Sequence, residues 1–249
     1  LGENWAPAII DEVGYYSNAL WAVGHHDGHW QVVGTYNGGD GTTYYSDDGI
    51  NFTHVDNNSG DSMIGLAWDY FTARWYAVAG TRYQTSNDYG RTWAADGAIS
   101  GVHIRDLIGR SDGDLRLVGV GDNSSAAYST DGGINWTPAT SVPDTGKRLM
   151  GVAYDGGTTW VAVGYTNDVG VNDAYIYTSS DGGVNWYAAG SYENTERLFE
   201  VAFDSVSGRF IAVGNNGAIQ YSTDLGYSWT RSTDAAIPQV AFFGIGGGQ

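Results

Sequence analysis

The chain has 249 residues, a hydrophobic content of 42% and a formal net charge of −17 at pH 7. So acidic a surface repels phosphate backbones and anionic membranes, and we expect neither a nucleic-acid partner nor membrane insertion. The sequence contains no cysteine, which excludes disulfides, thiol catalysis and cysteine-based zinc sites.

The composition favours strands and turns over helices. Glycine occurs 38 times and proline only four times, and aspartate outnumbers glutamate by 23 to 5. Aspartate suits turns, whereas glutamate suits helices. No apolar run approaches the ~18 residues that a membrane-spanning helix needs. These features predict a β protein with many tight turns.

Five related octets follow one another along the chain, at residues 45–52, 86–93, 129–136, 179–186 and 222–229. They share the pattern S-x-D-x-G-x-x-W, from which the first copy departs at Tyr45 and Phe52. In this alignment the aspartates, spaced by 41, 43, 50 and 43 residues, are Asp47, Asp88, Asp131, Asp181 and Asp224. The last positions are Phe52, Trp93, Trp136, Trp186 and Trp229. So regular a spacing indicates a tandem repeat.

Each repeat contains four short apolar runs separated by Gly, Asp and Asn, and none of the runs shows a helical period. Four strands in about 43 residues are typical of one blade of a β-propeller. We name the strands of a blade A to D, with the octet between C and D. The sequence predicts an all-β propeller of four-stranded antiparallel blades, in one domain over residues 1–249. The repeats span approximately 19–58, 59–98, 99–142, 143–191 and 192–235.

The two ends of the chain, residues 1–18 and 236–249, also carry strand-like sequence. The segment "NWAPAI" at 4–9 resembles "NWTPAT" at 135–140, which is a predicted D strand. The segment "IPQVAFFG" at 237–244 resembles "LFEVAFDS" at 198–205, which is a predicted A strand. We expect five full blades with the two ends completing the ring. The alternative is six blades, the last of them assembled from both ends.

The octet resembles the Asp-box, also called the BNR repeat, and the resemblance covers roughly residues 19–232. This repeat occurs in sialidases, in xyloglucan-cleaving propeller hydrolases, in a photosystem II assembly factor and in sortilin-type receptors. The resemblance implies the propeller fold but no single function, because these proteins do unrelated things. It also implies that a functional site lies on the face opposite the boxes.

The Asp-box aspartates themselves are expected to be structural. The carboxylate can accept backbone N–H groups of its own turn, the glycine permits a positive φ, and the tryptophan can pack over the turn. A calcium loop would need further oxygen ligands at a spacing that no copy has. We therefore interpret the octet as a lock on the turn between strands C and D.

On the opposite face, two slots in the predicted A strands vary in charge. The first slot holds Asn18, Ser62, His103, Arg148 and Arg197. The second, three residues later, holds Trp21, Gly65, Asp106, Gly151 and Glu200. We predict that His103, Arg148 and Arg197 bind ligand. Asp106 and Glu200 are the predicted catalytic pair of a hydrolase. The alternative is that the two arginines only neutralise nearby carboxylates, namely Asp106, Glu200 or Glu196.

Three loop tyrosines of this face, Tyr36, Tyr165 and Tyr192, are predicted to stack on sugar rings. Asp168 and Asp173 are a candidate loop cation site, and we otherwise expect no cofactor and no metal. Loops of unequal length on a regular scaffold usually carry specificity.

The stretch "GHHDGHW" at 24–30 gathers three histidines around one aspartate. It falls in the predicted A–B turn of the first blade, on the Asp-box face. A turn brings two such side chains together but rarely supplies a full ligand set. We therefore expect no metal site there.

These observations predict a non-catalytic binding module that recognises a glycan or a cell-surface partner. One alternative is a glycoside hydrolase or lyase acting with carboxylates near the ring centre, and another is a protein-assembly scaffold. A sialidase is disfavoured because the F/Y-R-I-P segment that usually precedes the first box is absent. The acidic, nearly lysine-free composition fits an extracellular protein of a bacterial or viral surface, and we expect a monomer.

Overall fold

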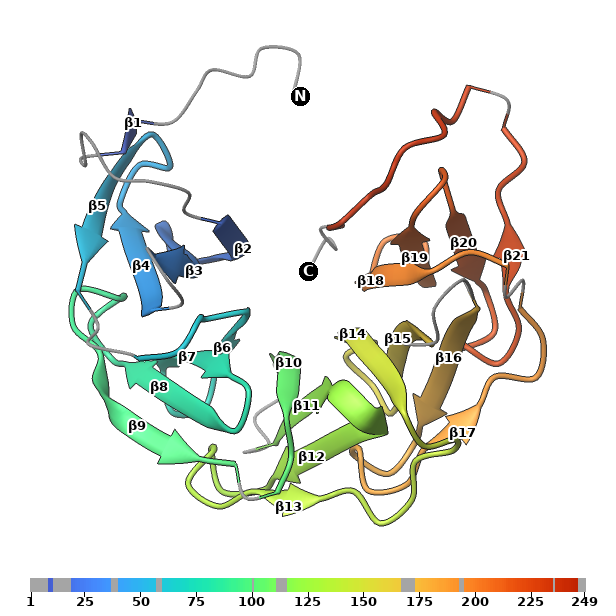
Figure 1. Ribbon diagram of the computed structural model, residues 1–249, viewed down its shortest axis with the longest axis horizontal. Helices are drawn as coiled ribbons and strands as arrows, with labels where there is room; N and C mark the ends of the chain where they lie inside the picture. The colour runs from blue at the N-terminus through green and yellow to red at the C-terminus, as the bar shows by residue number, and fades with distance from the viewer. Residues whose placement is uncertain are drawn as a thin grey trace.

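The computed structural model describes residues 9–10, 19–36, 40–56, 60–99, 101–110, 116–166, 173–192, 195–234 and 236–245. In this part of the chain the regular structure is all β-strand, apart from the 3-10 turn η1 (Asp122–Ser124). The strands form five sheets that stand side by side along an arc around a common centre (Figure 1). The described part contains no helix long and apolar enough to cross a membrane.

Each sheet is one blade, in which neighbouring strands A to D pair antiparallel. Blade 1 comprises β2 (Ala19–His26), β3 (His29–Tyr36), β4 (Asp40–Ser46) and β5 (Asn51–Val55). Blade 2 comprises β6 (Gly65–Asp69), β7 (Arg74–Ala79), β8 (Arg82–Ser86) and β9 (Ala94–Ala98). Blade 3 comprises β10 (Ile104–Gly109), β11 (Leu117–Gly121), β12 (Ser125–Ser129) and β13 (Thr137–Pro138). Blade 4 comprises β14 (Lys147–Tyr154), β15 (Trp160–Thr166), β16 (Ala174–Ser179) and β17 (Tyr187–Ala188). Blade 5 comprises β18 (Leu198–Asp204), β19 (Arg209–Gly214), β20 (Ile219–Ser222) and β21 (Thr230–Arg231).

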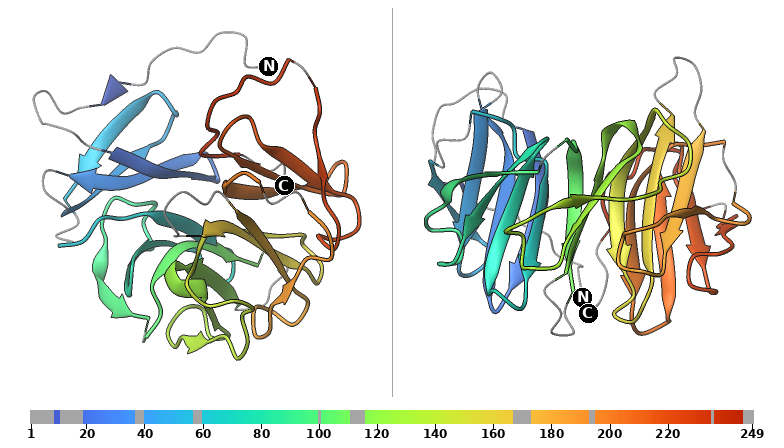
Figure 2. Two further views of the ribbon diagram at one scale, coloured as in Figure 1. Left: turned by 45° about the vertical axis from the view of Figure 1, so that its right-hand side comes forward. Right: turned by 90° about the horizontal axis from the view of Figure 1, so that it is seen from below.

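The predicted fold class is confirmed, since the chain is a β-propeller with five full four-stranded blades. The A strands lie innermost and the D strands outermost (Figure 1). Seen edge-on, the strands run between two faces of the ring (Figure 2). We call the face with the A–B turns and the Asp-box turns the box face, and the face with the B–C loops the loop face.

The described parts of the chain ends form little regular structure. Ile9 and Ile10 form the two-residue strand β1 (Ile9–Ile10), which pairs parallel with the outer edge of β5. Residues 4–8 of the expected D strand lie outside the described residues. The predicted A strand at 237–244 was wrong, because no strand forms in residues 236–245.

In four of the five blades, strand A bulges at the same place. The register shifts lie between Leu20 and Ala22, Ile104 and Asp106, Leu149 and Gly151, and Leu198 and Glu200. Opposite each bulge strand B has a glycine, namely Gly34, Gly121, Gly164 or Gly214. A Cβ at any of these glycines would clash with a carbonyl oxygen of strand A. Blade 2 has Ala79 at this position, and its A–B ladder begins only at Gly65, beyond the place of the bulge. In the four ladders that reach this place, a glycine lies opposite the bulge.

The bulge also corrects the alignment of the second charged slot. The residues that pair with the matching valine of strand B are Ala22, Gly65, Asp106, Gly151 and Glu200. The assignment of Trp21 to this slot was therefore wrong. Trp21 is the extra, bulged residue, and its indole donates a hydrogen bond of 2.7 Å to Thr35. In the first slot Ala19 replaces Asn18, which lies outside the described residues.

The hydrophobic core lies between neighbouring blades. Strand A of one blade packs on strands B and C of the blade before it, as Leu149 packs with Val118 and Val120. The four residues Met63, Ile104, Leu149 and Leu198 occupy equivalent positions and are at most 1% exposed. The ring is thus held together by the same contact repeated from blade to blade.

Candidate functional site

The Asp-box turns are closed hydrogen-bond networks. In the third copy the Ser129 hydroxyl donates to Asp131 at 2.8 Å and accepts from the Gly133 N–H at 2.8 Å. The Asp131 carboxylate also accepts from the Asn135 backbone at 2.9 Å and from its side chain at 2.6 Å. The same contacts recur around Asp88, Asp181 and Asp224. These four carboxylates therefore serve as acceptors within their own turns.

The first copy contains a shorter turn, and the assignment of Asp47 to the box was wrong. Ser46 donates to Asp48 at 2.9 Å, and the Asn51 N–H donates to Asp48 at 2.8 Å. The hydrogen bonds from Asn51 and Ile50 hold the pKa of Asp48 well below its usual range. The signal in the sequence was the serine, because Ser46 stands two residues before Asp48 as in every other copy.

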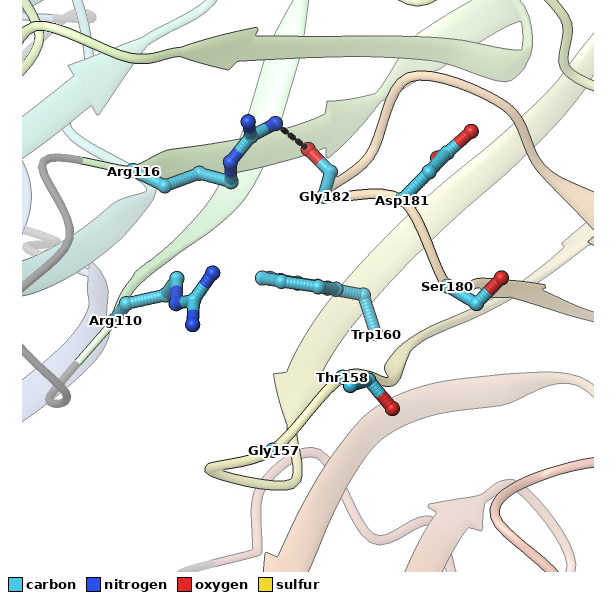
Figure 3. Close-up of a pocket in the computed structure, with 8 residues that line it drawn as sticks. All are labelled: Arg110, Arg116, Gly157, Thr158, Trp160, Ser180, Asp181 and Gly182. Atoms are coloured by element: carbon cyan, nitrogen blue, oxygen red, sulfur yellow. Dashed lines mark hydrogen bonds between the residues drawn. The ribbon is translucent and has the colours of Figure 1, made fainter.

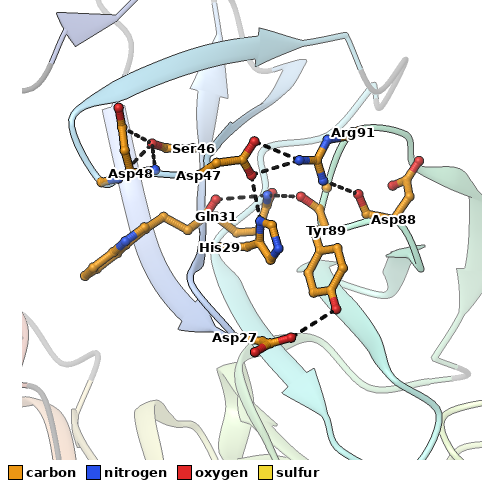
Figure 4. A network of polar contacts seen from close by, with 12 residues as sticks. Asp27, His29, Gln31, Ser46, Asp47, Asp48, Asp88, Tyr89 and Arg91 are labelled. Atoms are coloured by element: carbon orange, nitrogen blue, oxygen red, sulfur yellow. Dashed lines mark hydrogen bonds and ion pairs between the residues drawn. The ribbon is translucent and has the colours of Figure 1, made fainter.

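Asp47 instead joins blade 1 to blade 2. Its carboxylate accepts two hydrogen bonds of 2.8 Å from Arg91 and lies 2.6 Å from His29 Nδ1 (Figure 4). The hydrogen bond with His29 is the largest cause of its lowered pKa, to which the Arg91 charge adds. The buried Gln31 donates to the Tyr89 carbonyl at 2.6 Å beside this pair. The interface between these two blades is therefore polar on the box face.

The aromatic residues of the boxes differ in whether a ring N–H donates a hydrogen bond to the turn. The indoles of Trp136, Trp186 and Trp229 each donate to the carbonyl of the box glycine at 2.9–3.0 Å. The buried Trp93 Nε1 has no hydrogen-bond partner in the described part of the chain, and Phe52 has no donor. The last three boxes are therefore the complete ones.

The three histidines of residues 25–29 face different partners. His25 packs on Trp30, with ring centroids 4.5 Å apart, and His26 stacks on Trp68 at 4.1 Å. His29 turns to Asp47, as described above. Among the residues that the structure describes, no group of three or more His, Asp or Glu side chains is arranged to hold a metal ion.

Asp106 and Glu200 come together around the inner strand of blade 4. The Asp106 carboxylate accepts the Val152 N–H at 2.9 Å, and a side chain at Gly151 would meet the Glu200 carboxylate. Burial raises the pKa of Asp106 to about 7. Burial also raises the pKa of Glu200, and the charge of Asp106 adds to this shift. Two such carboxyl groups titrate as one unit.

No ion pair joins Arg148 or Arg197 to Asp106, Glu200 or Glu196 within the described residues, so the alternative that the arginines neutralise these three carboxylates was wrong. The partner of Arg148 on the loop face is Asp122, at the start of η1. Asp122 accepts from Arg105 Nε at 2.6 Å, from Arg105 Nη2 at 3.0 Å and from Arg148 Nε at 2.9 Å. His103 Nδ1 lies 3.3 Å from the same carboxylate. Desolvation opposes ionisation of Asp122, but the Arg105 hydrogen bond and the nearby charges lower its pKa.

Tyr165 joins the two predicted arginines. Its hydroxyl accepts from Arg148 at 3.2 Å, and the Arg197 guanidinium lies 4.8 Å from the centre of its ring. Tyr165 is only 8% exposed, so the prediction that its ring stacks on a sugar was wrong. Its ring instead supports the arginines. We call Asp122, His103, Arg105, Arg148, Tyr165 and Arg197 the arginine cluster.

An aromatic row leads away from the arginine cluster. Phe199 meets the edge of Tyr165 at 5.8 Å between ring centroids, and Phe243 stacks on Phe199 at 4.9 Å. Phe243 is 74% exposed. Phe199 is itself a bulged residue, as is Arg105. A guanidinium group and an exposed aromatic ring therefore lie at the two ends of one row.

The arginine cluster holds more positive than negative charge. Two guanidinium groups, of Arg105 and Arg148, contact the one carboxylate of Asp122. A third, of Arg197, lies on Tyr165, and its buried Nε has no hydrogen-bond partner among the described residues. Glu196 accepts from Asn216 at 2.9 Å. In a chain with 11 basic residues and a net charge of −17, three arginines are thus gathered at one place on the loop face.

The remaining predicted residues lie elsewhere. Tyr192 is half-buried against the core between blades 4 and 5, and burial raises its pKa. Tyr36 ends β3, but its side chain lies outside the described residues, as does Asp168 of the candidate cation site. The Asp173 carbonyl accepts from the Thr166 N–H at 3.1 Å.

Sequence reasoning missed Asp122 and Arg105. Asp122 directly follows the glycine that ends strand B, where the other blades have Thr35, Gly80, Tyr165 and Asn215. Comparing these positions would have singled out the only acid. Arg105 occupies the bulge, which shifts its side chain out of the regular alternation.

A pocket of about 260 Å³ opens on the box face between blades 3 and 4 (Figure 3). Its lining consists of Arg110, Arg116, Gly157, Thr158, Trp160, Ser180, Asp181 and Gly182. Arg116 donates to the Gly182 carbonyl at 2.8 Å, across the blade boundary. Neither Asp106 nor Glu200 lines this pocket.

Comparisons with known proteins agree with the fold. The BNR/Asp-box repeat family matches residues 127–138, and no curated protein matches the chain in sequence. The structure is similar to YCF48 bound to D1 peptide, with a TM-score of 0.59 and 15% identity over 90% of this chain and 71% of that chain. It is also similar to the GH74 xyloglucanase from Xanthomonas campestris, with a TM-score of 0.63 and 16% identity over 84% of this chain and 37% of that chain.

A third similar structure is the GH74 enzyme from Niastella koreensis, with a TM-score of 0.59 and 19% identity over 90% of this chain and 32% of that chain. The chain therefore spans about a third of the length of either GH74 enzyme. Identities this low show the fold alone. The repeats, the blades and these similarities identify the chain as a β-propeller of the BNR/Asp-box repeat superfamily, without a specific member.

Proposed function

We propose that the protein is a non-catalytic binding module whose arginine cluster binds the acidic groups of a glycan. The observation that carries this proposal is the surplus of guanidinium groups around Asp122 on the loop face. Guanidinium groups pair bidentately with carboxylates. Asp122 already holds Arg105 and Arg148 in place, so a ligand would meet a site that is largely preorganised.

The aromatic row supports a sugar ligand. Phe243 exposes its ring at the end of a row that begins at Tyr165 and Arg197, so an acidic sugar at Arg197 would place a neighbouring ring near Phe243. A surface location in a bacterium or virus, as expected from the composition, is part of this proposal.

A protein partner is the second candidate. The YCF48 structure holds a peptide, and an acidic peptide would use the same guanidinium groups. A glycoside hydrolase is less well supported, since Asp106 and Glu200 accept backbone N–H groups at 2.9 Å. A hydrolase must place its substrate between two carboxyl groups.

The test measures binding of oligogalacturonate, with a neutral oligosaccharide of equal length and a polyglutamate peptide as comparisons. We expect Arg197→Ala and Arg148→Ala to weaken oligogalacturonate binding by about tenfold or more, and added salt to weaken it further. Arg82→Ala, an exposed arginine of blade 2, is the matched control and should bind normally.

Three results would count against the proposal. Binding of the peptide alone would favour the protein partner. Equal binding by the Arg197→Ala and Arg82→Ala proteins would show that the arginine cluster does not bind the ligand. Release of shorter products that stops in Asp106→Asn would make the protein a hydrolase.

A further inference from the structure

Blade 1 exposes the side of strand A that every later blade buries. Leu20 is 46% exposed, whereas its equivalents Met63, Ile104, Leu149 and Leu198 are at most 1% exposed. Val23 is 62% exposed, whereas its equivalents Leu107, Val152 and Val201 are 3–4% exposed and Leu66 of blade 2 is partly buried. We call this side of a blade its upstream face, because it packs on the preceding blade. The upstream face of blade 1 is therefore uncovered within the described residues.

The other blades show what normally covers an upstream face. Leu198 and Val201 of blade 5 share one core cluster with Val161, Val163 and Ile176 of blade 4. These last three residues lie on strands B and C. Blade 4 packs on blade 3 in the same way. The complementary surface is thus a pair of B and C strands with branched aliphatic side chains.

The backbone pairing beside blade 1 is the pairing that a preceding blade would make. Ser141 runs parallel to Asn185, and Ser191 runs parallel to Ser228, where the chain leaves one blade and passes the next Asp-box. β1 runs parallel to β5 at the same position, with Ile9 opposite Asn51. β1 therefore stands where the D strand of a blade before blade 1 would end.

Blade 5, at the other end of the arc, accepts the hydrogen bond that strand A of a following blade would donate. The Met63 N–H donates to the Gly34 carbonyl at 3.1 Å, where strand A of blade 2 begins on blade 1. The Phe242 N–H donates to Gly214, the equivalent glycine of blade 5, at 2.8 Å. The segment around Phe242 thus lies where strand A of a blade after blade 5 would begin. Figure 1 shows blades 1 and 5 at the two ends of the arc.

We propose that a sixth-blade position lies between blades 5 and 1 and that a β-hairpin of a partner protein fills it. Of this sixth blade, the described part of the chain itself supplies only the start of the inner strand, around Phe242, and the end of the outer strand, at β1. Within the described residues no strand takes the place of strands B and C. A hairpin with alternating branched aliphatic residues would cover Leu20 and Val23 as strands B and C do elsewhere.

A second copy of the chain is a poorer occupant. The downstream face that it would offer, on blade 5, is partly covered by residues 236–245, since the Gly217 N–H donates to the Val240 carbonyl at 2.7 Å. Two copies would also bring together two chains of net charge −17, which repel each other. The same charge favours a basic partner.

The first experiment labels single introduced cysteines, which is possible because the sequence contains no cysteine of its own. Val23→Cys, Val152→Cys and Val206→Cys are each treated with a maleimide. Val206 is 92% exposed and serves as the open control, and Val152 is the buried equivalent of Val23. We expect Val23→Cys to react within about threefold of Val206→Cys and Val152→Cys to react about 100-fold more slowly. Protection of Val23→Cys in the isolated chain would mean that the chain covers this face itself, which overturns the proposal.

The second experiment uses a synthetic hairpin with the sequence of residues 159–179, which are strands B and C of blade 4. A fluorescent form of this peptide should bind saturably and slow the labelling of Val23→Cys by about tenfold or more. Leu20→Asp should abolish binding, whereas Val206→Asp should leave it unchanged, with normal folding confirmed by thermal unfolding. Absence of binding, or Leu20-dependent dimerisation in sedimentation, would contradict the proposal.

Discussion

At the scale of single residues, Asp122 does the most to shape the loop face. It takes hydrogen bonds from two arginines that belong to different blades, so it both orders their side chains and joins blades 3 and 4. Charge-assisted hydrogen bonds of this kind are stronger than neutral ones. Arg197 remains outside this network and rests on Tyr165. The arginine that we expect to matter most for the ligand is therefore the one that Asp122 does not hold.

The neighbours Asp47 and Asp48 allow a direct test of the corrected Asp-box. Asp48→Ala removes the acceptor for the Ser46 hydroxyl and the Asn51 N–H, so we expect the melting temperature to fall by about 4 °C or more. Asp47→Ala removes exposed contacts to Arg91 and His29 and should lower the melting temperature by about 2 °C or less, because exposed ion pairs contribute little. Thermal unfolding monitored by circular dichroism measures both values. Asp131→Ala is the reference for a box aspartate. A larger fall of the melting temperature in Asp47→Ala than in Asp48→Ala would show that Asp47 is the box aspartate after all.

Some residue roles could be predicted from the sequence and others could not. The box aspartates of the last four repeats followed from local hydrogen-bond chemistry, because serine, aspartate and glycine act within one turn. Asp47 was misassigned because the first turn is one residue shorter. The partners of Arg148 could not be predicted, since they depend on which loop residue of another blade reaches it. Pairing between distant segments is not encoded in any local pattern.

At the scale of the strand, a glycine of strand B lies opposite the bulge in strand A. Gly164 faces the Arg148 carbonyl, and a methyl group there would clash with it. We expect Gly164→Ala to destabilise the fold by roughly 2 kcal/mol or more, because the bulge that positions Arg148 would have to shift. The measurement is urea-induced unfolding, together with oligogalacturonate binding.

Two variants make this prediction specific. Ala79→Gly, at the equivalent position of blade 2, where the backbone already carries a side chain, should cost only about 0.5–1 kcal/mol, as expected for a glycine in a strand. Gly60→Ala adds a methyl group where no atom lies within 4 Å and should have little effect. If all three variants were equally stable, the link between this glycine and the bulge would be lost.

The strands themselves were predictable because their signal repeats five times, and the bulges were not. A bulge changes the count of residues on one strand only, so the regular alternation fails just where Arg105, Met150 and Phe199 stand. The "VG" of strand B was the available clue. Blade 2 has "VA" instead, and its A–B ladder begins at Gly65, beyond the place of the bulge.

At the scale of the whole molecule, the blades are held together as a chain of similar interfaces. Each interior blade is supported on two sides, whereas blade 1 is supported on one. Stability in such an assembly is close to a sum of neighbour contacts. The exposure of Leu20 could not be predicted from the sequence, because it depends on what stands beside blade 1.

The carboxyl pair of Asp106 and Glu200 gives the molecule an unusual pH dependence. Both pKa values are raised by burial in the folded state, so the folded chain binds more protons than the unfolded one above about pH 4. The pair therefore stabilises the fold while it is protonated, and this contribution is lost as the pH rises through the folded pKa of Asp106, about 7. The box aspartates, whose pKa values are lowered, act in the opposite sense only at lower pH.

We therefore expect the free energy of unfolding to fall between pH 5 and pH 8, by at most about 1.4 kcal/mol per pH unit for each proton released. The lowered pKa of His26, caused by burial, opposes this trend near its own titration, so the comparison must be made between variants. Asp106→Asn should flatten the profile relative to the unmodified chain, and Asp61→Asn, at an exposed carboxylate 4.0 Å from Arg82 on blade 2, should not. Urea unfolding at constant ionic strength gives the profiles. Parallel profiles for the unmodified chain and Asp106→Asn would show that the pair does not hold an extra proton in the folded state, because removing one carboxyl group would then have left the proton balance of folding unchanged.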